Sequence, residues 1–108
     1  GAGTSNQGYA GGLGHGYLSG NTNNGRGGTG GGAGAVGIDE PAVGTAGAAG
    51  LASLITGSSV TRANGGGVGT VTAGAANSGI GGGSATSNSA PNGTSGGSGI
   101  VIIKYKFQ

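Results

Sequence analysis

Two short stretches of this chain match patterns that elsewhere bind dinucleotides or activate a serine. Gly25-Arg26-Gly27-Gly28-Thr29-Gly30 fits G-x-G-x-x-G, and Gly93-Thr94-Ser95-Gly96-Gly97 fits G-x-S-x-G. The first pattern binds a dinucleotide only after a strand, and the second needs a preceding strand, a following helix and a downstream histidine. No strand-like run precedes the first match, and the single histidine, His15, lies upstream of the second. In a chain with 33 glycines, both matches are interpreted as coincidental.

The remaining ionisable residues are too few for acid–base or metal chemistry. Asp39 and Glu40 are the only carboxylates. Neighbours on an extended chain point to opposite sides, so the two cannot flank a substrate as a glycosidase pair does. Lone carboxylates seldom suffice for calcium, His15 has no companion ligand, and the absence of cysteine excludes thiolate zinc sites. We therefore expect no catalytic residue, no metal and no cofactor, with both carboxylates in a solvated loop before Pro41.

Recognition is the chemistry that the first quarter of the chain favours. Tyr9, His15, Tyr17 and Arg26 belong to residue types that carry recognition energy at interfaces. Two interpretations remain open: these side chains cover exposed backbone at the edge of a scaffold, or they contact a receptor or glycan. Asn92-Gly93-Thr94 is the only N-x-[ST] sequon, and it would be glycosylated only in a eukaryotic secreted protein.

The composition excludes several classes of protein. Gly, Ala, Ser, Thr and Asn make up 77 of 108 residues, whereas Val, Ile, Leu and Phe number 17. That share lies below the roughly 20% at which an ordinary apolar core becomes doubtful. The chain has no Gly-X-Y register, no apolar run long enough to span a membrane and no visible signal peptide. Its four cations are scattered, so nucleic acid is not an expected partner. Only 6% of residues are charged, unlike a disordered chain, and the absence of methionine favours a fragment or a processed product.

Glycine is concentrated in short runs that must position every other residue. Dense runs cover 11–16, 25–37, 65–69, 79–83 and 96–99, with a thinner Ala/Gly stretch at 44–50. Between them lie Asn-, Ser- and Thr-rich connectors, which favour turns. A polyproline-II helix has three residues per turn and no internal hydrogen bonds, so its N–H and C=O groups point outward. Without Cβ atoms, such rods can approach closely and bond backbone to backbone.

These runs predict a layered bundle of polyglycine-II helices with turns at both ends. The interior of such a bundle is peptide backbone, and a Cβ atom on an inward face would keep the rods apart. The scaffold positions that we expect to require glycine are Gly27, Gly28, Gly31, Gly32, Gly66, Gly67, Gly82 and Gly83.

Two segments depart from the glycine pattern. Leu51, Leu54 and Ile55 have the i, i+3, i+4 spacing of a helix, which predicts a short helical turn near 51–56 closed by Gly57. Residues 99–107 carry the only strong strand signal, first apolar on both faces and then alternating between lysines and aromatics.

A β-strand near 99–107 needs a partner. Within the chain, Val60–Arg62 and Val68–Val71 are weak candidates. Otherwise the strand pairs with missing sequence or with another subunit. The residues expected to form this possible inter-subunit strand are Ile100, Val101, Ile102, Ile103 and Tyr105.

The same segments carry a resemblance to a known family. Gly96-Gly97-Ser98-Gly99-Ile100-Val101-Ile102-Ile103-Lys104-Tyr105 resembles the closing signature, G-G-S-G-I-V-I-I-R-Y, of glycine-rich domains in bacteriophage tail-fibre and other virion-associated proteins. Residues 55–67 resemble that family's I-[ST]-G-x-x-V-T-x-A-G-G-G-G element, and the spacing of the glycine runs agrees over most of the chain. Arg62 stands where an aromatic often sits, Asn64 replaces a glycine, and the family's opening strand is absent, which favours truncation.

The resemblance implies a stacked polyglycine-II sandwich, a rigid scaffold whose turns at one end touch a host receptor. We therefore expect residues 1–108 to form a single glycine-rich domain of a virion tail fibre, located on the virion or outside the cell. It would present loops to a host-surface receptor or glycan and assemble with other fibre subunits as a homo-oligomer, without membrane insertion.

Three alternatives remain. The first is a subunit of a self-assembling extracellular filament, joined through the C-terminal strand. The second is an ice-binding protein, although the regular Thr or Ala period of a flat ice face is missing. The third is a fully disordered chain, which would melt without a cooperative transition.

Overall fold

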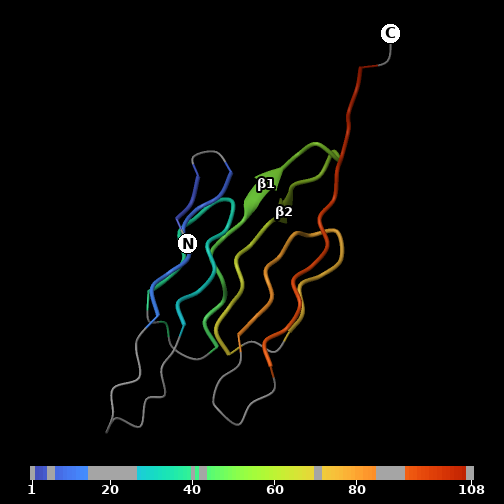
Figure 1. Ribbon diagram of the computed structural model, residues 1–108. Coiled ribbons are helices and arrows are strands. Elements are labelled where there is room, and N and C mark those ends of the chain that lie inside the picture. Colours follow the sequence, from blue (N-terminus) through green and yellow to red (C-terminus); the bar gives the residue numbers. More distant parts are fainter. Residues whose placement is uncertain are drawn as a thin grey trace, which may run out of the picture.

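The computed structural model describes residues 2–4, 7–14, 27–39, 41, 44–69, 72–84 and 92–106. Within these residues there are two short strands and no helix: β1 spans Leu51–Ser53 and β2 spans Val60–Arg62. The two strands pair antiparallel, with Leu51 opposite Arg62 and Ser53 opposite Val60. The other described segments run beside one another with a single isolated bridge, between Val68 and Ser84 (Figure 1).

The helical turn expected near 51–56 is wrong, because this segment forms the first half of a β-hairpin. Residues 51–53 are β1, and the turn that follows is closed by a hydrogen bond of 2.9 Å from Gly57 N–H to Leu54 O. Gly57 has φ +93°, a conformation that favours glycine. Leu51 and Leu54 are 63% and 68% exposed, so no apolar face is buried that would stabilise so short a helix.

The strand expected at 99–107 is also corrected by the structure. Residues 99–106 form no strand, and Phe107 lies outside the described residues. This segment, the C-terminal tail, leaves the body of the molecule in an extended course (Figure 1). Its last described tie to the body is the hydrogen bond from Gly79 N–H to Ser98 O. Val60–Arg62, one of the two suggested partners, pairs with β1 instead.

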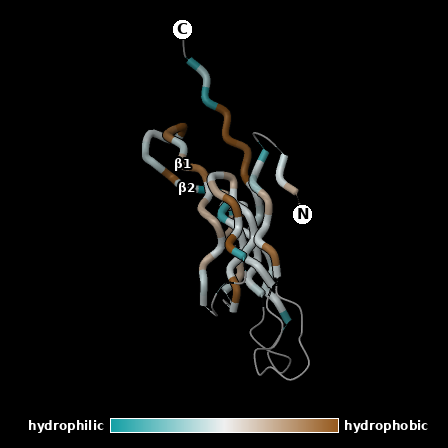
Figure 2. The backbone as a smooth tube through the Cα atoms, turned by 90° about the vertical axis from the view of Figure 1, so that its left-hand side faces the viewer, coloured by the Kyte–Doolittle hydropathy of each residue, from teal (hydrophilic) through white to brown (hydrophobic). Residues whose placement is uncertain are grey.

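Main chain rather than apolar side chains fills the interior of the described part. Ala48, Val68 and Pro41 are the buried apolar side chains there, and Thr29 is the buried polar one. The longest apolar stretch lies on the C-terminal tail, outside the body (Figure 2). The packing of the described segments therefore depends on their backbone contacts.

Several pairs of neighbouring segments are joined by backbone hydrogen bonds that lie three residues apart. This spacing joins segment 7–14 to 27–34, segment 44–50 to 63–68, and segment 63–68 to 78–84. The bonds are Tyr9 N–H to Gly32 O (3.0 Å), Gly12 N–H to Thr29 O (2.8 Å), Gly65 N–H to Ala48 O (2.8 Å), Val68 N–H to Thr45 O (2.9 Å), Gly81 N–H to Asn64 O (3.0 Å) and Ser84 N–H to Gly67 O (3.0 Å). A β-ladder follows a two-residue period, whereas three residues per turn is the period of polyproline II.

Segment 27–34 is bonded to four neighbours, which a β-strand cannot achieve. Its backbone exchanges hydrogen bonds with 7–14, 35–39, 44–50 and 63–68. The last two of these are also bonded to each other, so three segments contact one another mutually. Because a strand directs its N–H and C=O groups to two sides only, it has at most two neighbours in one plane. The described segments therefore pack in more than one plane, with 27–34 at the centre.

Candidate functional site

Gly30, Gly31 and Gly32 are consecutive and face three different neighbours. A Cβ built on any of them would come closer to backbone atoms than real Cβ contacts allow. The nearest backbone atom would belong to Gly66 for Gly30, to Tyr9 for Gly31 and to Ala49 for Gly32. Three successive residues that face three different neighbours are what a helix with three residues per turn produces. The glycine run therefore lets one segment pack on three sides at once.

The other predicted scaffold glycines differ in their surroundings. A Cβ on Gly28 would overlap the backbone of Gly12, and one on Gly66 would overlap the carbonyl oxygen of Gly82. Gly82 in turn faces the carbonyl oxygen of Thr94 at a distance that leaves no room for a Cβ. These three positions have no space for any side chain.

Gly27, Gly67 and Gly83 complete the predicted set. A Cβ on Gly27 would meet nothing within 4 Å, so the steric argument does not extend to that position. The carbonyl oxygens of Gly67 and Gly83 accept hydrogen bonds from Ser84 N–H at 3.0 Å and Thr94 N–H at 2.9 Å. These two glycines contribute acceptors to the bonding between segments.

Thr29, inside the G-x-G-x-x-G match, is part of the packing and not of a phosphate loop. Its side chain is 1% exposed, and its Oγ1 accepts a hydrogen bond of 2.7 Å from Ile38 N–H. Its backbone N–H donates to Ile38 O, and its carbonyl accepts from Gly12 N–H. Every one of these contacts joins neighbouring segments, so the match carries no nucleotide-binding geometry in the residues that the structure describes.

The G-x-S-x-G match likewise lacks the setting of a nucleophile elbow. Residues 92–98 contain neither strand nor helix, and Ser95 is exposed. The adjacent Thr94 has a structural role that sequence reasoning missed: its Oγ1 accepts from Gly83 N–H at 2.8 Å and donates to Thr72 O at 3.0 Å. It thereby joins two segments.

Asp39 bonds to the backbone instead of forming part of an acid–base pair. Its Oδ1 accepts a hydrogen bond of 2.6 Å from Leu13 N–H. Glu40 lies outside the described residues. The described part of the chain holds no group of three or more His, Cys, Asp or Glu side chains that could bind a metal ion. Nor does it contain a helix long and apolar enough to cross a membrane.

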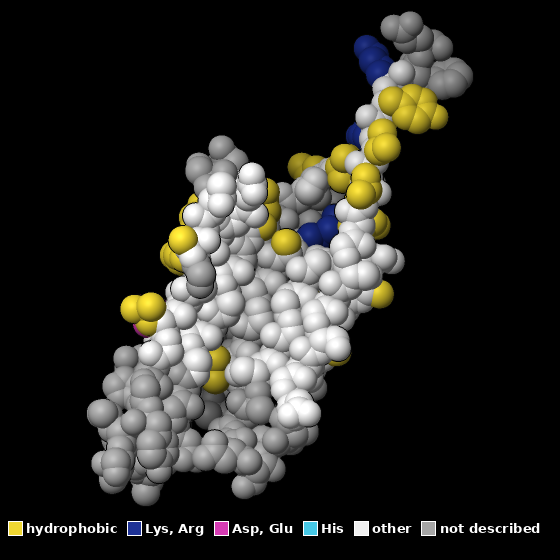
Figure 3. Space-filling model, in the orientation of Figure 1, with side chains coloured by type: hydrophobic (Ala, Val, Ile, Leu, Met, Phe, Trp, Pro, Cys, Tyr) yellow, Lys and Arg dark blue, Asp and Glu magenta, His cyan; other side chains and the backbone are white. Residues whose placement is uncertain are grey.

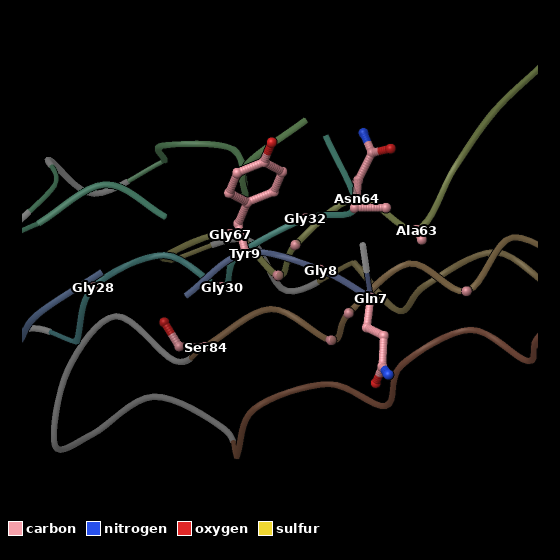
Figure 4. A pocket seen from close by; sticks show the side chains of 17 residues that line it. Gln7, Gly8, Tyr9, Gly28, Gly30, Gly32, Ala63, Asn64, Gly67 and Ser84 are labelled. Carbon is pink, nitrogen blue, oxygen red and sulfur yellow. The ribbon is translucent and has the colours of Figure 1, made fainter. Parts of the chain in front are cut away.

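Tyr9 is the one predicted recognition residue that lies within the described residues; His15, Tyr17 and Arg26 do not. Its side chain is 53% exposed and borders a hollow of about 590 Å³ whose floor is formed by glycines of 28–32, 65–67 and 79–82. Tyr9 and Asn64 point to the same side in this hollow, whereas Gln7 points to the opposite side (Figure 4). On the side of Tyr9, an aromatic ring and the Asn64 amide make a surface suited to hydrogen-bonding, uncharged ligands.

A second hollow, the β1 groove, lies between the N-terminal segment and β1. It has a volume of about 860 Å³ and carries three exposed apolar side chains, Tyr9, Val36 and Leu51. The remaining lining residues are Gly3, Thr4, Gln7, Gly8, Ala10 and Ala33. None of the lining residues is charged, so the groove suits an apolar ligand.

The C-terminal tail carries the most exposed large apolar side chains of the described chain. Val101 is 88%, Ile103 81% and Tyr105 79% exposed. In the space-filling view, apolar side chains follow one another along the projecting tail, with basic side chains among and beyond them (Figure 3). Such a contiguous apolar surface is unusual on a soluble monomer.

Comparison with known proteins gives no match. No family of known proteins, no curated protein and no solved structure matches it, and hence no enzyme family or enzyme homologue does.

Proposed function

We propose that this chain is a structural and adhesive module of a virion fibre, in which a polyglycine-II bundle presents surface loops to a host receptor. The observation that supports the scaffold most strongly is segment 27–34, which is bonded to four neighbours, and to three of them through hydrogen bonds spaced three residues apart. Rods with three residues per turn account for both the spacing and the number of neighbours.

Rigidity follows from the same packing. Backbone carbonyl oxygens occupy the places where Cβ atoms would project from Gly28, Gly31, Gly32, Gly66 and Gly82. Rods in such close contact cannot slide without breaking several hydrogen bonds together. A fibre that transmits force between a virus particle and a cell surface needs this property.

The adhesive part of the proposal assigns receptor contact to Tyr9 together with His15, Tyr17 and Arg26. Tyr9 supports it through its exposed ring beside the glycine-floored hollow. The ligand class that fits this surface is a glycan or another uncharged polar receptor, because an aromatic face and amide groups recognise sugar hydroxyls without charge. The module would then act on the virion or outside the cell.

A cell-binding assay tests this function. The fluorescently labelled chain is mixed with a panel of bacterial strains and bound fluorescence is measured. We expect binding to a subset of strains, and loss of that binding by Tyr9→Ala at an unchanged melting temperature. Binding by Tyr9→Ala equal to that of the parent chain would contradict the assignment of Tyr9. Virion genes adjacent to the coding gene would support the viral setting independently.

A self-assembling extracellular filament is the second candidate, favoured by the exposed C-terminal tail. An apolar segment without a partner in its own chain can join subunits. Electron micrographs taken over a range of concentrations distinguish the two proposals, since a filament subunit forms polymers without any virion protein.

A further inference from the structure

The C-terminal tail has one face that is apolar throughout and a second face that carries its lysines. Successive residues of an extended chain point to opposite sides. Val101, Ile103 and Tyr105 therefore share one face, and each is at least 79% exposed. Ile100 and Ile102, followed by Lys104 and Lys106, lie on the other face. A ligand surface for this tail must accept three apolar side chains in a row and leave two ammonium groups in water.

The β1 groove has the matching properties. Tyr9, Val36 and Leu51 are 53%, 57% and 63% exposed, which is unfavourable for apolar side chains. No charged residue lines the groove. Its border at Leu51 is also the start of β1, which is paired on one side only within the described residues. An extended peptide that lies there could add to an open strand edge while its side chains enter the groove.

A tail does not reach the groove of its own chain. The hydrogen bonds order the segments as 7–14, 27–34, 63–68, 78–84 and 94–98. The tail continues from segment 94–98, whereas segment 7–14, at the opposite edge, lines the groove. Tail and hairpin nevertheless project at the same end of the molecule in both views (Figures 1 and 2). Two copies that meet at this end can bring each tail to the groove of the other.

We propose that the C-terminal tail of one copy docks in the β1 groove of a second copy. Val101, Ile103 and Tyr105 would cover the exposed apolar side chains of the groove, and both lysines would face solvent. Every chain carries one donor and one acceptor, so docking leaves neither surface exposed in the assembly. This inference deepens the oligomeric part of the proposed function. Because Tyr9 lines the groove, docking would compete with receptor contact through that ring.

Sedimentation equilibrium of the full chain is the first test, with one variant on each face of the tail. We expect the parent chain to associate, and Ile103→Asp to raise its dissociation constant by about tenfold or more, since a carboxylate cannot enter an apolar groove. Lys104→Asp introduces the same side chain on the opposite face and should change the constant by less than about threefold. A parent chain that stays monomeric at high concentration, or equal effects of the two variants, would overturn the proposal.

Cysteine cross-linking identifies the two surfaces, because the chain has no native cysteine. Chains carrying Ile103→Cys are mixed under oxidising conditions with chains carrying Val36→Cys. We expect the mixed disulfide as the main product, whereas Ser58→Cys, at the exposed hairpin turn, should give little with Ile103→Cys. A main product that links two Ile103→Cys chains would show tails pairing with each other and would reject the groove as acceptor. The Ile103→Asp variant is also tested for cell binding as a monomer. Because this variant cannot dock, its cell binding reports on the adhesive proposal alone.

Discussion

Gly66 lies against the carbonyl oxygen of Gly82 so closely that a Cβ on Gly66 would overlap that oxygen. The two residues belong to neighbouring segments that are hydrogen bonded through Gly81 N–H and Asn64 O at 3.0 Å. Close approach and hydrogen bonding are one and the same requirement here, because the two backbones bond directly only if nothing stands between them.

Alanine at Gly66 or Gly82 should therefore destabilise the fold. A Cβ must displace backbone at either position, and overpacking of this kind costs roughly 1–3 kcal/mol or more. Gly27→Ala is the matched control: its Cβ meets nothing within 4 Å, and the loss of one flexible residue should stabilise by about 0.4–1 kcal/mol. Circular-dichroism melts of the three variants measure the difference. Equal melting temperatures would contradict an interior built from backbone.

Ala63 has φ +59°, in the region where a Cβ is strained, and its N–H donates to Ser78 O at 2.8 Å. The strain of an L-residue there costs about 1–2 kcal/mol, which glycine would relieve. Glycine in turn loses more backbone entropy on folding, which costs about 0.5–1 kcal/mol. Ala63→Gly should thus be neutral or stabilising by up to about 1.5 kcal/mol, as measured by urea denaturation. Ala52→Gly, in β1, provides the comparison and should lose stability. Loss of stability in both variants to the same extent would refute the strain at Ala63.

Thr29→Val tests the buried hydroxyl. The substitution keeps the shape of the side chain but removes the oxygen that accepts from Ile38 N–H at 2.7 Å. An unpaired, partly buried amide costs about 1–3 kcal/mol. Thr61→Val, on the exposed side of β2, should change the free energy of unfolding by less than about 0.5 kcal/mol. Both variants are measured by chemical denaturation. A Thr29→Val variant as stable as the parent would show that this hydrogen bond does not stabilise the fold.

Amide hydrogen exchange should separate the body from the tail. The amides of Gly12, Gly30 and Gly65 donate to neighbouring segments at 2.8 to 2.9 Å and should exchange only when the bundle opens. The amides of Val101 and Ile103 donate to no described residue and should exchange at rates close to those of an unfolded chain in the monomer. Protection of the tail that appears only at high protein concentration would match docking on a second copy.

The hairpin shows where local sequence patterns mislead. Leu51, Leu54 and Ile55 are spaced as on a helix, but the segment is only a few residues long, and both leucines remain exposed. Helical spacing stabilises a helix only when the spaced residues bury a continuous apolar face. Gly57 at φ +93° and the pairing with Val60–Arg62 determine the strand instead.

Composition alone determined that apolar side chains could not fill the interior, because 17 large apolar residues among 108 are too few. It also determined that backbone would have to contact backbone wherever glycine is dense. Only the tertiary structure decided which glycines are indispensable. Gly27 and Gly28 are adjacent and chemically identical, yet one faces open space and the other the backbone of Gly12. The reason is that glycine has no side chain whose polarity would indicate whether the residue faces the interior or solvent. Which way each glycine faces therefore depends on how the segments pack in space.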